Sequence, residues 1–420
     1  MNNFPVRKAI QTCSYNDSGD DLEKKIIEQP DRERAAGKDF VNHLILRNSG
    51  SAKDHLKFNI TIAGIPLFLY GLFGMHKAGF EEVVTVGNDD TGKIHRLFCD
   101  YFDIKGYEFV HEGQPQEWSM SNSIRKGQEK LNPGLNDVVL ISPGDTPLLD
   151  MLALASSEAV KEHDMVIPFN TKELCGDLFP RNYHVKAINE DGTEYLSKEP
   201  NALLLNIRKL EENRFGENIY DMAFSARKSY AAGSPQKKFF LEAVFKDNGG
   251  FSARRALRSL GIIKPGYFLS QASKLIARNT LGLKENDNNV LKLKIEIVEE
   301  LLQHALNIPD FKVKAYASPD PAGLLDVDSF QDVVFVEKML SLGQKSVYPH
   351  FDELKGFAGS VKSWGCDFTD NWKSFANECF HKYGIKAYYG NCTGFSQSTF
   401  PESVIEGEVE LIKRYRQSLK

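Results

Sequence analysis

The run Asp137-Val-Val-Leu-Ile-Ser-Pro-Gly-Asp-Thr-Pro-Leu-Leu149 decides the predicted fold. Residues 138–141 are all apolar, and three of the four are β-branched. A short unbroken apolar run of this composition is typical of a strand that is buried on both faces, in a sheet flanked by helices. Ser142, Pro143 and Gly144 then end the strand, so Asp145 is predicted to lie at its carboxyl end.

Asp145 is the first candidate for a functional residue. In open α/β sheets, ligands bind in the crevice outside the carboxyl ends of the strands. A carboxylate at that place suits a divalent cation that bridges to phosphates. The alternative is a turn that only ends the strand, with Asp145 as the cap of the following helix.

Strand-like and helix-like segments alternate at short spacing along most of the chain. This alternation predicts a mostly parallel, doubly wound sheet. The expected strands are 41–46, 82–87, 107–111, 138–141, 165–169, 183–188, 201–206, 311–317 and 323–325, and the expected helices include 68–78, 95–102, 119–131, 333–340 and 402–419.

The composition narrows the class of protein. The chain has 420 residues, a formal net charge of −5 and 41% hydrophobic residues, which indicates two or three structural units. The absence of an apolar run near ~18 residues argues against a membrane span. The start of the chain lacks the apolar segment of a signal peptide, and six scattered cysteines without a Cys-x-x-Cys pair indicate free thiols. We therefore expect a cytoplasmic protein, and its net acidity argues against nucleic acid as a partner.

Five stretches carry a family resemblance, and one of them is part of the run already quoted. They are Lys57-Phe-Asn-Ile-Thr-Ile-Ala-Gly-Ile-Pro-Leu67, Gly79-Phe-Glu-Glu-Val-Val-Thr-Val-Gly-Asn88, Ser119-Met-Ser-Asn-Ser-Ile-Arg-Lys-Gly127, Pro143-Gly-Asp-Thr-Pro-Leu-Leu149 and Gly323-Leu-Leu-Asp-Val-Asp-Ser-Phe-Gln-Asp332. In this order they resemble the motifs of MobA-like NTP transferases, over residues 41–340 with gaps. The resemblance implies a GT-A-like, three-layer α/β/α Rossmann-type fold, with a helical insertion and an additional α-rich block at the C-terminal end.

The resemblance also implies an activity and a set of site residues. The activity is transfer of a nucleoside monophosphate from an NTP to a small acceptor that carries a phosphate or hydroxyl, with release of pyrophosphate and with Mg²⁺ or Mn²⁺ as cofactor. The implied residues are Lys57 and Asp145 for catalysis; Asn48, Ser49, Gly50, Ser51, Lys57, Asn122 and Ser123 for the nucleotide; Asn201 and Asn206 for the acceptor; and Asp145, Asp326 and Asp328 for the metal.

The same reading divides the chain into five parts. These are an N-terminal arm (1–40), the NTP-binding half of the core (41–206), a helical insertion (207–310), the closing strand and helix of the core (311–340) and a C-terminal extension (341–420). Residues 251–283 in the insertion are basic and amphipathic. They predict either contact with a membrane surface or acidic partner, or a packed helical pair with a solvated basic face.

One departure from the family pattern leaves a second function open. The family has glycines after its first strand, whereas this chain has Leu46-Arg-Asn-Ser-Gly-Ser51. Glycine allows positive φ and lets the backbone approach a phosphate closely. The alternative is therefore a non-catalytic module that binds a nucleotide or a partner on the same fold. A sugar-nucleotide glycosyltransferase is disfavoured because the Asp-x-Asp of this chain lies late, at 326–328. The sequence is also compatible with a homo-oligomer.

Overall fold

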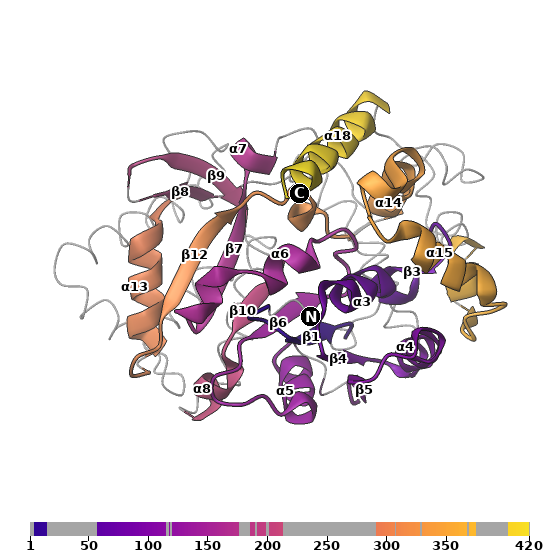
Figure 1. Cartoon of the computed structure of the whole chain (residues 1–420), viewed down its shortest axis with the longest axis horizontal. Coiled ribbons are helices and arrows are strands. Elements are labelled where there is room, and N and C mark those ends of the chain that lie inside the picture. Colours follow the sequence, from indigo (N-terminus) through magenta and orange to yellow (C-terminus); the bar gives the residue numbers. More distant parts are fainter. Residues whose placement is uncertain are drawn as a thin grey trace, which may run out of the picture.

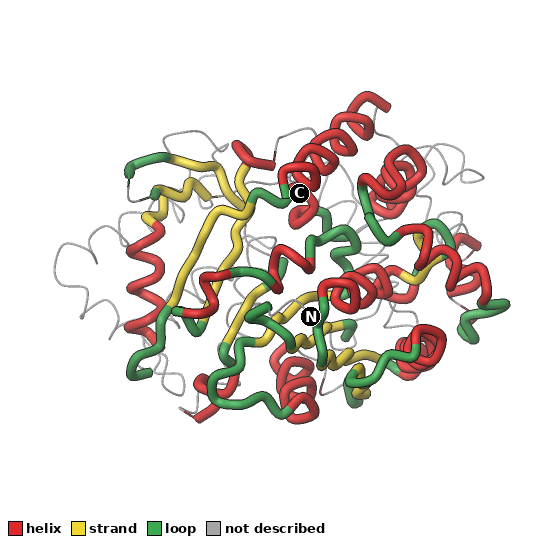
Figure 2. The backbone as a smooth tube through the Cα atoms, viewed as in Figure 1, coloured by secondary structure: helices red, strands yellow, loops and turns green. Residues whose placement is uncertain are grey.

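A mixed, mostly parallel sheet with helices on both faces forms the core of the protein (Figures 1 and 2). The computed structural model describes residues 4–14, 57–114, 117, 120–175, 185–189, 191–198, 201–212, 291–306, 308–327, 330–367, 369–374 and 402–419. Within these residues the sheet has ten strands in the order β11-β8-β9-β7-β10-β6-β1-β4-β5, with β12 paired to β7. The strands are β1 (Lys8–Thr12), β4 (Glu82–Gly87), β5 (Tyr107–His111), β6 (Val139–Pro143), β7 (Met165–Thr171), β8 (Val185–Ile188), β9 (Glu194–Lys198), β10 (Leu203–Leu205), β11 (Leu291–Lys294) and β12 (Val313–Ser318).

The parallel half of the sheet consists of β5, β4, β1 and β6. β1 pairs with β4 on one side and with β6 on the other, and β4 pairs with β5, all in parallel. The first four residues of β6 are buried, as the apolar run at 138–141 predicted. The predicted α/β fold class is therefore confirmed, and the carboxyl ends of these four strands lie at one edge of the sheet.

The N-terminal arm predicted for residues 1–40 is wrong at residues 8–12, which form the strand β1 between β4 and β6. The segment looked like a surface segment because it is short and contains Lys8 and Gln11. Gln11 is nevertheless buried, since its Nε2 donates to the Phe68 carbonyl at 2.9 Å and its Oε1 accepts from Thr85 Oγ1 at 3.3 Å. The strand predicted at 41–46 lies outside the described residues.

The other half of the sheet is mixed. β10 runs antiparallel to both β6 and β7, and β12 is parallel to β7. β8 and β9 pair antiparallel, and β11 adds to β8 in parallel. The predicted helical insertion at 207–310 thus contains a strand of the sheet near its end. Its basic stretch, 251–283, lies outside the described residues. The strand predicted at 323–325 is wrong: residues Pro321–Leu324 form the 3₁₀ helix η5.

Two apolar layers bury the faces of the sheet. One contains side chains of α3 (Leu67–Ala78), α4 (Asp89–Phe102), α6 (Met151–Ala155), α14 (Phe330–Gly343), α15 (Phe351–Ser360) and α18 (Glu402–Ser418). The other contains side chains of α5 (Met120–Leu131), α8 (Ile207–Glu212) and α13 (Ile295–Leu306). The neighbours Ala9 and Ile10 of β1 belong to different layers, as alternation along a strand requires. The remaining described elements are α7 (Lys172–Cys175), the hairpin β2 (Thr61–Ile62) and β3 (Ile65–Pro66), and the 3₁₀ helices η2 (Lys57–Asn59), η4 (Glu158–Lys161) and η6 (Gln344–Ser346).

The described part of the C-terminal extension is helical and packs on the core. Tyr348 donates its hydroxyl to the Tyr70 carbonyl at 2.7 Å, and Trp372 Nε1 donates to Thr61 Oγ1 at 2.9 Å. Phe357 of α15 packs edge-on against Phe98 of α4, with ring centroids 5.8 Å apart. Tyr348, Phe357 and Trp372 of this extension therefore belong to one apolar layer. Among the described helices, none is both long and apolar enough to cross a bilayer.

The close packing of α5 on β1 gives a stability test. A Cβ added at Gly127 would lie 2.6 Å from Ile10 Cγ2, whereas a Cβ at Gly359, in α15, would meet nothing within 4 Å. We expect Gly127→Ala to lower the free energy of unfolding by about 1–3 kcal/mol through overpacking. Gly359→Ala should instead raise it by about 0.5–1 kcal/mol, because alanine favours the helix. Urea denaturation measures both, and equal effects of the two variants would contradict the described packing.

Candidate functional site

The candidate site lies where the four parallel strands end. Because their carboxyl ends share one edge, the residues that follow them are neighbours: Cys13 after β1, Asn88 after β4, Glu112 after β5 and Asp145 after β6. Asn88 serves the fold, since its side chain caps α4 by accepting from Thr91 N at 2.9 Å.

A tight turn after β6 places Asp145. Gly144 N donates to the Thr12 carbonyl at 2.9 Å, which extends the pairing of β6 with β1 by one residue. A Cβ at position 144 would lie 2.5 Å from Cys13 Sγ and 3.1 Å from Phe68 Cβ. Only glycine fits this contact, and the turn then leaves Asp145 with 9% of its surface exposed.

Lys57 and Asp145 form an ion pair across 88 residues of sequence. Their side chains are 12% and 13% exposed. Lys57 belongs to the short helix η2, and its neighbour Phe58 packs in the apolar layer that contains the side chains of α3. Water is largely excluded from the pair, so the attraction between its charges is stronger than that of a surface pair. The structure thus brings together the two residues for which the sequence suggested a catalytic role.

The predicted metal ligands are only partly described. Val327 N donates to the Asp145 carbonyl at 2.9 Å, which places half-buried Asp326 beside the Asp145 turn. Asp328 lies outside the described residues. Within the described part of the chain, no three His, Cys, Asp or Glu residues are grouped as a metal site. One or two carboxylates suffice for Mg²⁺ that also binds substrate phosphates and water, so the donor set of Asp145 and Asp326 suits Mg²⁺ of that kind.

Two buried groups at this edge were not predicted from the sequence. Cys13 is fully buried, and burial, followed by the charges of Asp145 and Glu112, raises the pKa of its thiol well above the usual value. Glu112 is 2% exposed, and its carbonyl accepts from Lys126 Nζ at 3.1 Å. A signal for Glu112 was present, because it directly follows the predicted strand 107–111, and Asp145 likewise lies just after the end of a strand.

The first turn of α5 lies against the loop that follows β5. Asn122 Nδ2 donates to the Glu112 carbonyl at 3.4 Å, and Asn122 Oδ1 accepts from Arg125 at 2.6 Å. Ser123 is buried next to it. The hydroxyl of Ser121 is also buried and has no hydrogen-bond partner among the described residues. These residues are thus at the same edge as Asp145. The predicted phosphate loop, Asn48 to Ser51, lies outside the described residues.

The two predicted acceptor residues lie at opposite ends of β10. Because β10 is antiparallel to β6, Asn201 precedes it at the carboxyl edge of β6, whereas Asn206 follows it at the far edge. Asn201 Nδ2 donates to the Gly323 carbonyl at 2.9 Å. Asn206 is buried, donates to the Leu135 carbonyl at 2.7 Å and accepts from Lys209 N at 3.1 Å as the cap of α8. The acceptor role predicted for Asn206 is therefore wrong, and its role is structural.

Comparisons with known proteins give a distant likeness of fold. No protein-family model matches the chain, and no curated protein matches it. One similar structure is 4-diphosphocytidyl-2C-methyl-D-erythritol synthase from Anaerococcus prevotii, at 13% identity over 80% of this chain and 99% of that chain, with a TM-score of 0.36. Another is the inositol-1-phosphate CTP transferase from T. maritima, at 16% identity over 50% of this chain and 73% of that chain, with a TM-score of 0.33.

The burial of the Lys57–Asp145 pair can be tested by measuring the coupling free energy between the two residues in a double-mutant cycle of Lys57→Met and Asp145→Leu. Each single variant leaves the other charge without its partner in a largely dry site, so we expect a coupling free energy of about 1–3 kcal/mol from urea denaturation. The same cycle at Lys345 and Asp352, an exposed pair 2.7 Å apart, should give a much smaller coupling because water screens it. Equal couplings would refute the described burial.

The raised pKa of Cys13 predicts an unreactive thiol. At pH 8 the folded protein should keep Cys13 protonated, and only the thiolate reacts with iodoacetamide. Peptide mapping by mass spectrometry should show Cys13 modified in urea and unmodified in the folded protein. Rapid modification of Cys13 in the folded protein would show that the turn at Gly144 does not cover it.

Proposed function

We propose that the protein is a nucleotidyltransferase that transfers a nucleoside monophosphate from an NTP to a small acceptor carrying a phosphate or hydroxyl. The observation that carries the proposal is the Lys57–Asp145 pair at the carboxyl edge of a parallel sheet. That edge is where open α/β sheets bind their ligands. A carboxylate and an ammonium group placed together there suit a substrate that consists of phosphates and a divalent cation.

Asp145 would bind Mg²⁺ or Mn²⁺, with Asp326 or Asp328 as a second carboxylate. The bound ion would supply positive charge across the phosphates of the NTP. Without nucleotide, Lys57 neutralises the buried Asp145 carboxylate. With nucleotide, Lys57 would turn to the phosphates and neutralise the charge that develops on them. The pair therefore keeps both charges balanced in a largely dry site before the substrate arrives.

The remaining residues would position the two substrates. Asn122 and Ser123, at the start of α5, would contact the base or ribose, and the loop at 48–51 would surround the phosphates. Asn201 is the acceptor candidate that remains, since it lies at the same edge as Asp145. An oxygen of the acceptor would attack the α-phosphorus in line with the leaving pyrophosphate. Positioning and charge neutralisation account for most of the rate in reactions of this kind.

The test measures pyrophosphate release with each of the common NTPs, Mg²⁺ and a panel of sugar phosphates and alcohol phosphates. We expect Asp145→Asn to lower the rate about 10²-fold or more, because it removes charge at the reacting phosphates. The matched control is Asp137→Asn. Asp137 precedes the same strand at its opposite end, where its Oδ2 lies 3.1 Å from Lys8 Nζ, so this variant should keep the wild-type rate.

Two results would contradict the proposal. An Asp145→Asn variant as active as the wild type would remove Asp145 from the mechanism. Binding of Mg²⁺ and NTP by calorimetry without turnover on any acceptor would instead identify the alternative function, a nucleotide-binding module.

A further inference from the structure

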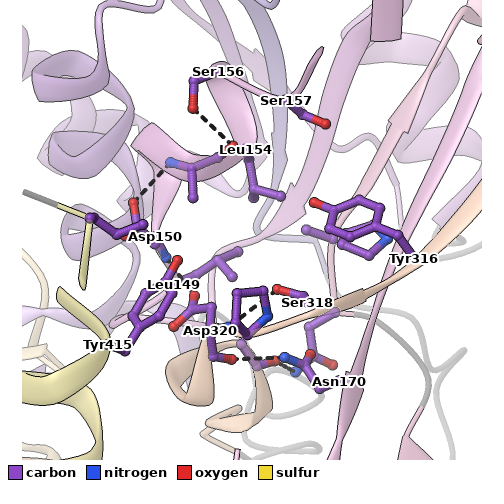
Figure 3. A pocket seen from close by; sticks show the side chains of 17 residues that line it. Leu149, Asp150, Leu154, Ser156, Ser157, Asn170, Tyr316, Ser318, Asp320 and Tyr415 are labelled. Carbon is purple, nitrogen blue, oxygen red and sulfur yellow. Dashed lines mark hydrogen bonds between the residues drawn. The ribbon is translucent and has the colours of Figure 1, made fainter. Parts of the chain in front are cut away.

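Next to α6 lies a pocket that Asp145 does not line. Its volume is about 310 Å³, and it is bounded by α6, β7, β12, η5 and α18. This volume is at the lower end of the range of small-molecule sites. Most of the lining is apolar, with Leu149 and Leu154 among its residues, and polar side chains such as Ser157, Asp150 and Asn170 lie on different sides of it (Figure 3).

Two tyrosine side chains form facing walls of this pocket. Tyr316 comes from β12 and Tyr415 from α18, and Figure 3 shows them on opposite sides of the pocket with Asp320 between them. Aromatic faces carry negative electrostatic potential and attract cations, including quaternary ammonium groups. The walls of the pocket are therefore both apolar and favourable to positive charge.

Two buried carboxylates, those of Asp150 and Asp320, line the pocket. Asp320 is 3% exposed; its Oδ2 accepts from Asp150 N at 3.0 Å and its Oδ1 from Ala322 N at 2.9 Å. Asp150 caps α6 by accepting from Ala153 N at 3.0 Å. All three donors are neutral backbone groups, so they satisfy hydrogen bonds without balancing charge.

The one cationic side chain described beside these carboxylates does not line the pocket. Arg416 of α18 has Nη1 3.9 Å from Asp150 Oδ2 and donates its Nη2 to the Leu148 carbonyl at 3.2 Å. One guanidinium therefore faces two carboxylates. Burial, followed by the charge of Asp150, raises the pKa of Asp320 to about 6. A positive group in the pocket would relieve this energetic cost.

We propose that the pocket binds a small organic cation, with its ammonium group near Asp320 and between the rings of Tyr316 and Tyr415. The two carboxylates disfavour phosphates and nucleotides, so the ligand class differs from that of the Asp145 site. Asn201, the acceptor candidate of the proposed transferase, also lines this pocket, but binding of an organic cation here goes beyond that reaction and does not depend on it.

The test is calorimetry on the full chain with matched pairs of probes. Choline is compared with its neutral isostere 3,3-dimethylbutan-1-ol, and n-butylammonium with butan-1-ol. We expect at least one ammonium probe to bind with one-to-one stoichiometry, and its neutral counterpart to bind about tenfold more weakly. The proposal fails if neither ammonium probe binds up to about 10 mM, or if the neutral probes bind equally well.

Variants locate the binding. Tyr316→Leu should weaken binding of the ammonium probe about tenfold, whereas Tyr316→Phe, which keeps the ring, should bind as the wild type does. Tyr101→Leu is the control, because Tyr101 is an exposed tyrosine on α4. Circular dichroism checks that each variant folds. An unchanged affinity in Tyr316→Leu overturns the proposal.

Asp145→Asn separates this proposal from the transferase proposal. It should lower the rate of pyrophosphate release about 10²-fold or more and leave binding of the ammonium probe unchanged. Loss of probe binding in Asp145→Asn would place the cation in the Asp145 site and refute binding in this pocket.

Discussion

The five-residue strand β1 joins β4 and β5 to the rest of the sheet. β4 and β6 both pair with β1, so β4 and β5 connect to the other strands through these residues. The arrangement requires Gln11 to be buried, and it is tolerated because its amide group has a partner at each end. The same strand supplies the Thr12 carbonyl and the Cys13 side chain, which shape the turn that carries Asp145.

The candidate site balances its charges within the protein. Asp145 lies where burial disfavours an isolated carboxylate, and Lys57 supplies the compensating charge. The neighbouring pocket contains two carboxylates but only the more distant Arg416 as a described cation. The two sites therefore differ in their charge balance, although Asp145 and Asp150 are only five residues apart in sequence.

Much of the sheet could be predicted because its strands are short apolar runs. Most residues of the runs at 82–87, 138–141 and 165–169 are buried, and each run corresponds to a strand in the structure, with β6 beginning at Val139. β1 was missed because a buried glutamine looks like a surface residue until its partners are known. The apolar run at 323–325 was misread because three residues do not distinguish a strand from a 3₁₀ helix.

Site residues could be predicted from the sequence only where their position did not depend on the direction in which a strand runs in the sheet. Asp145 was found because a strand ends just before it, and Lys57 was found from the family resemblance. Their contact depends on η2 folding back over the edge of the sheet, which no local pattern indicates. Asn206 was misassigned because the sequence does not reveal that β10 runs antiparallel to β6, and this direction decides which end of β10 faces the site.

The contact of Arg416 with the turn that follows Asp145 has a consequence for folding during synthesis. The guanidinium of Arg416 and the Leu148 carbonyl that it binds are 268 residues apart in sequence. On the ribosome, this part of the site stays incomplete until α18 has emerged. Contacts between such distant residues form late, because a long loop must close before they contribute stability. The apolar face that α18 covers is then exposed in the nascent chain, which makes this face a natural binding surface for chaperones.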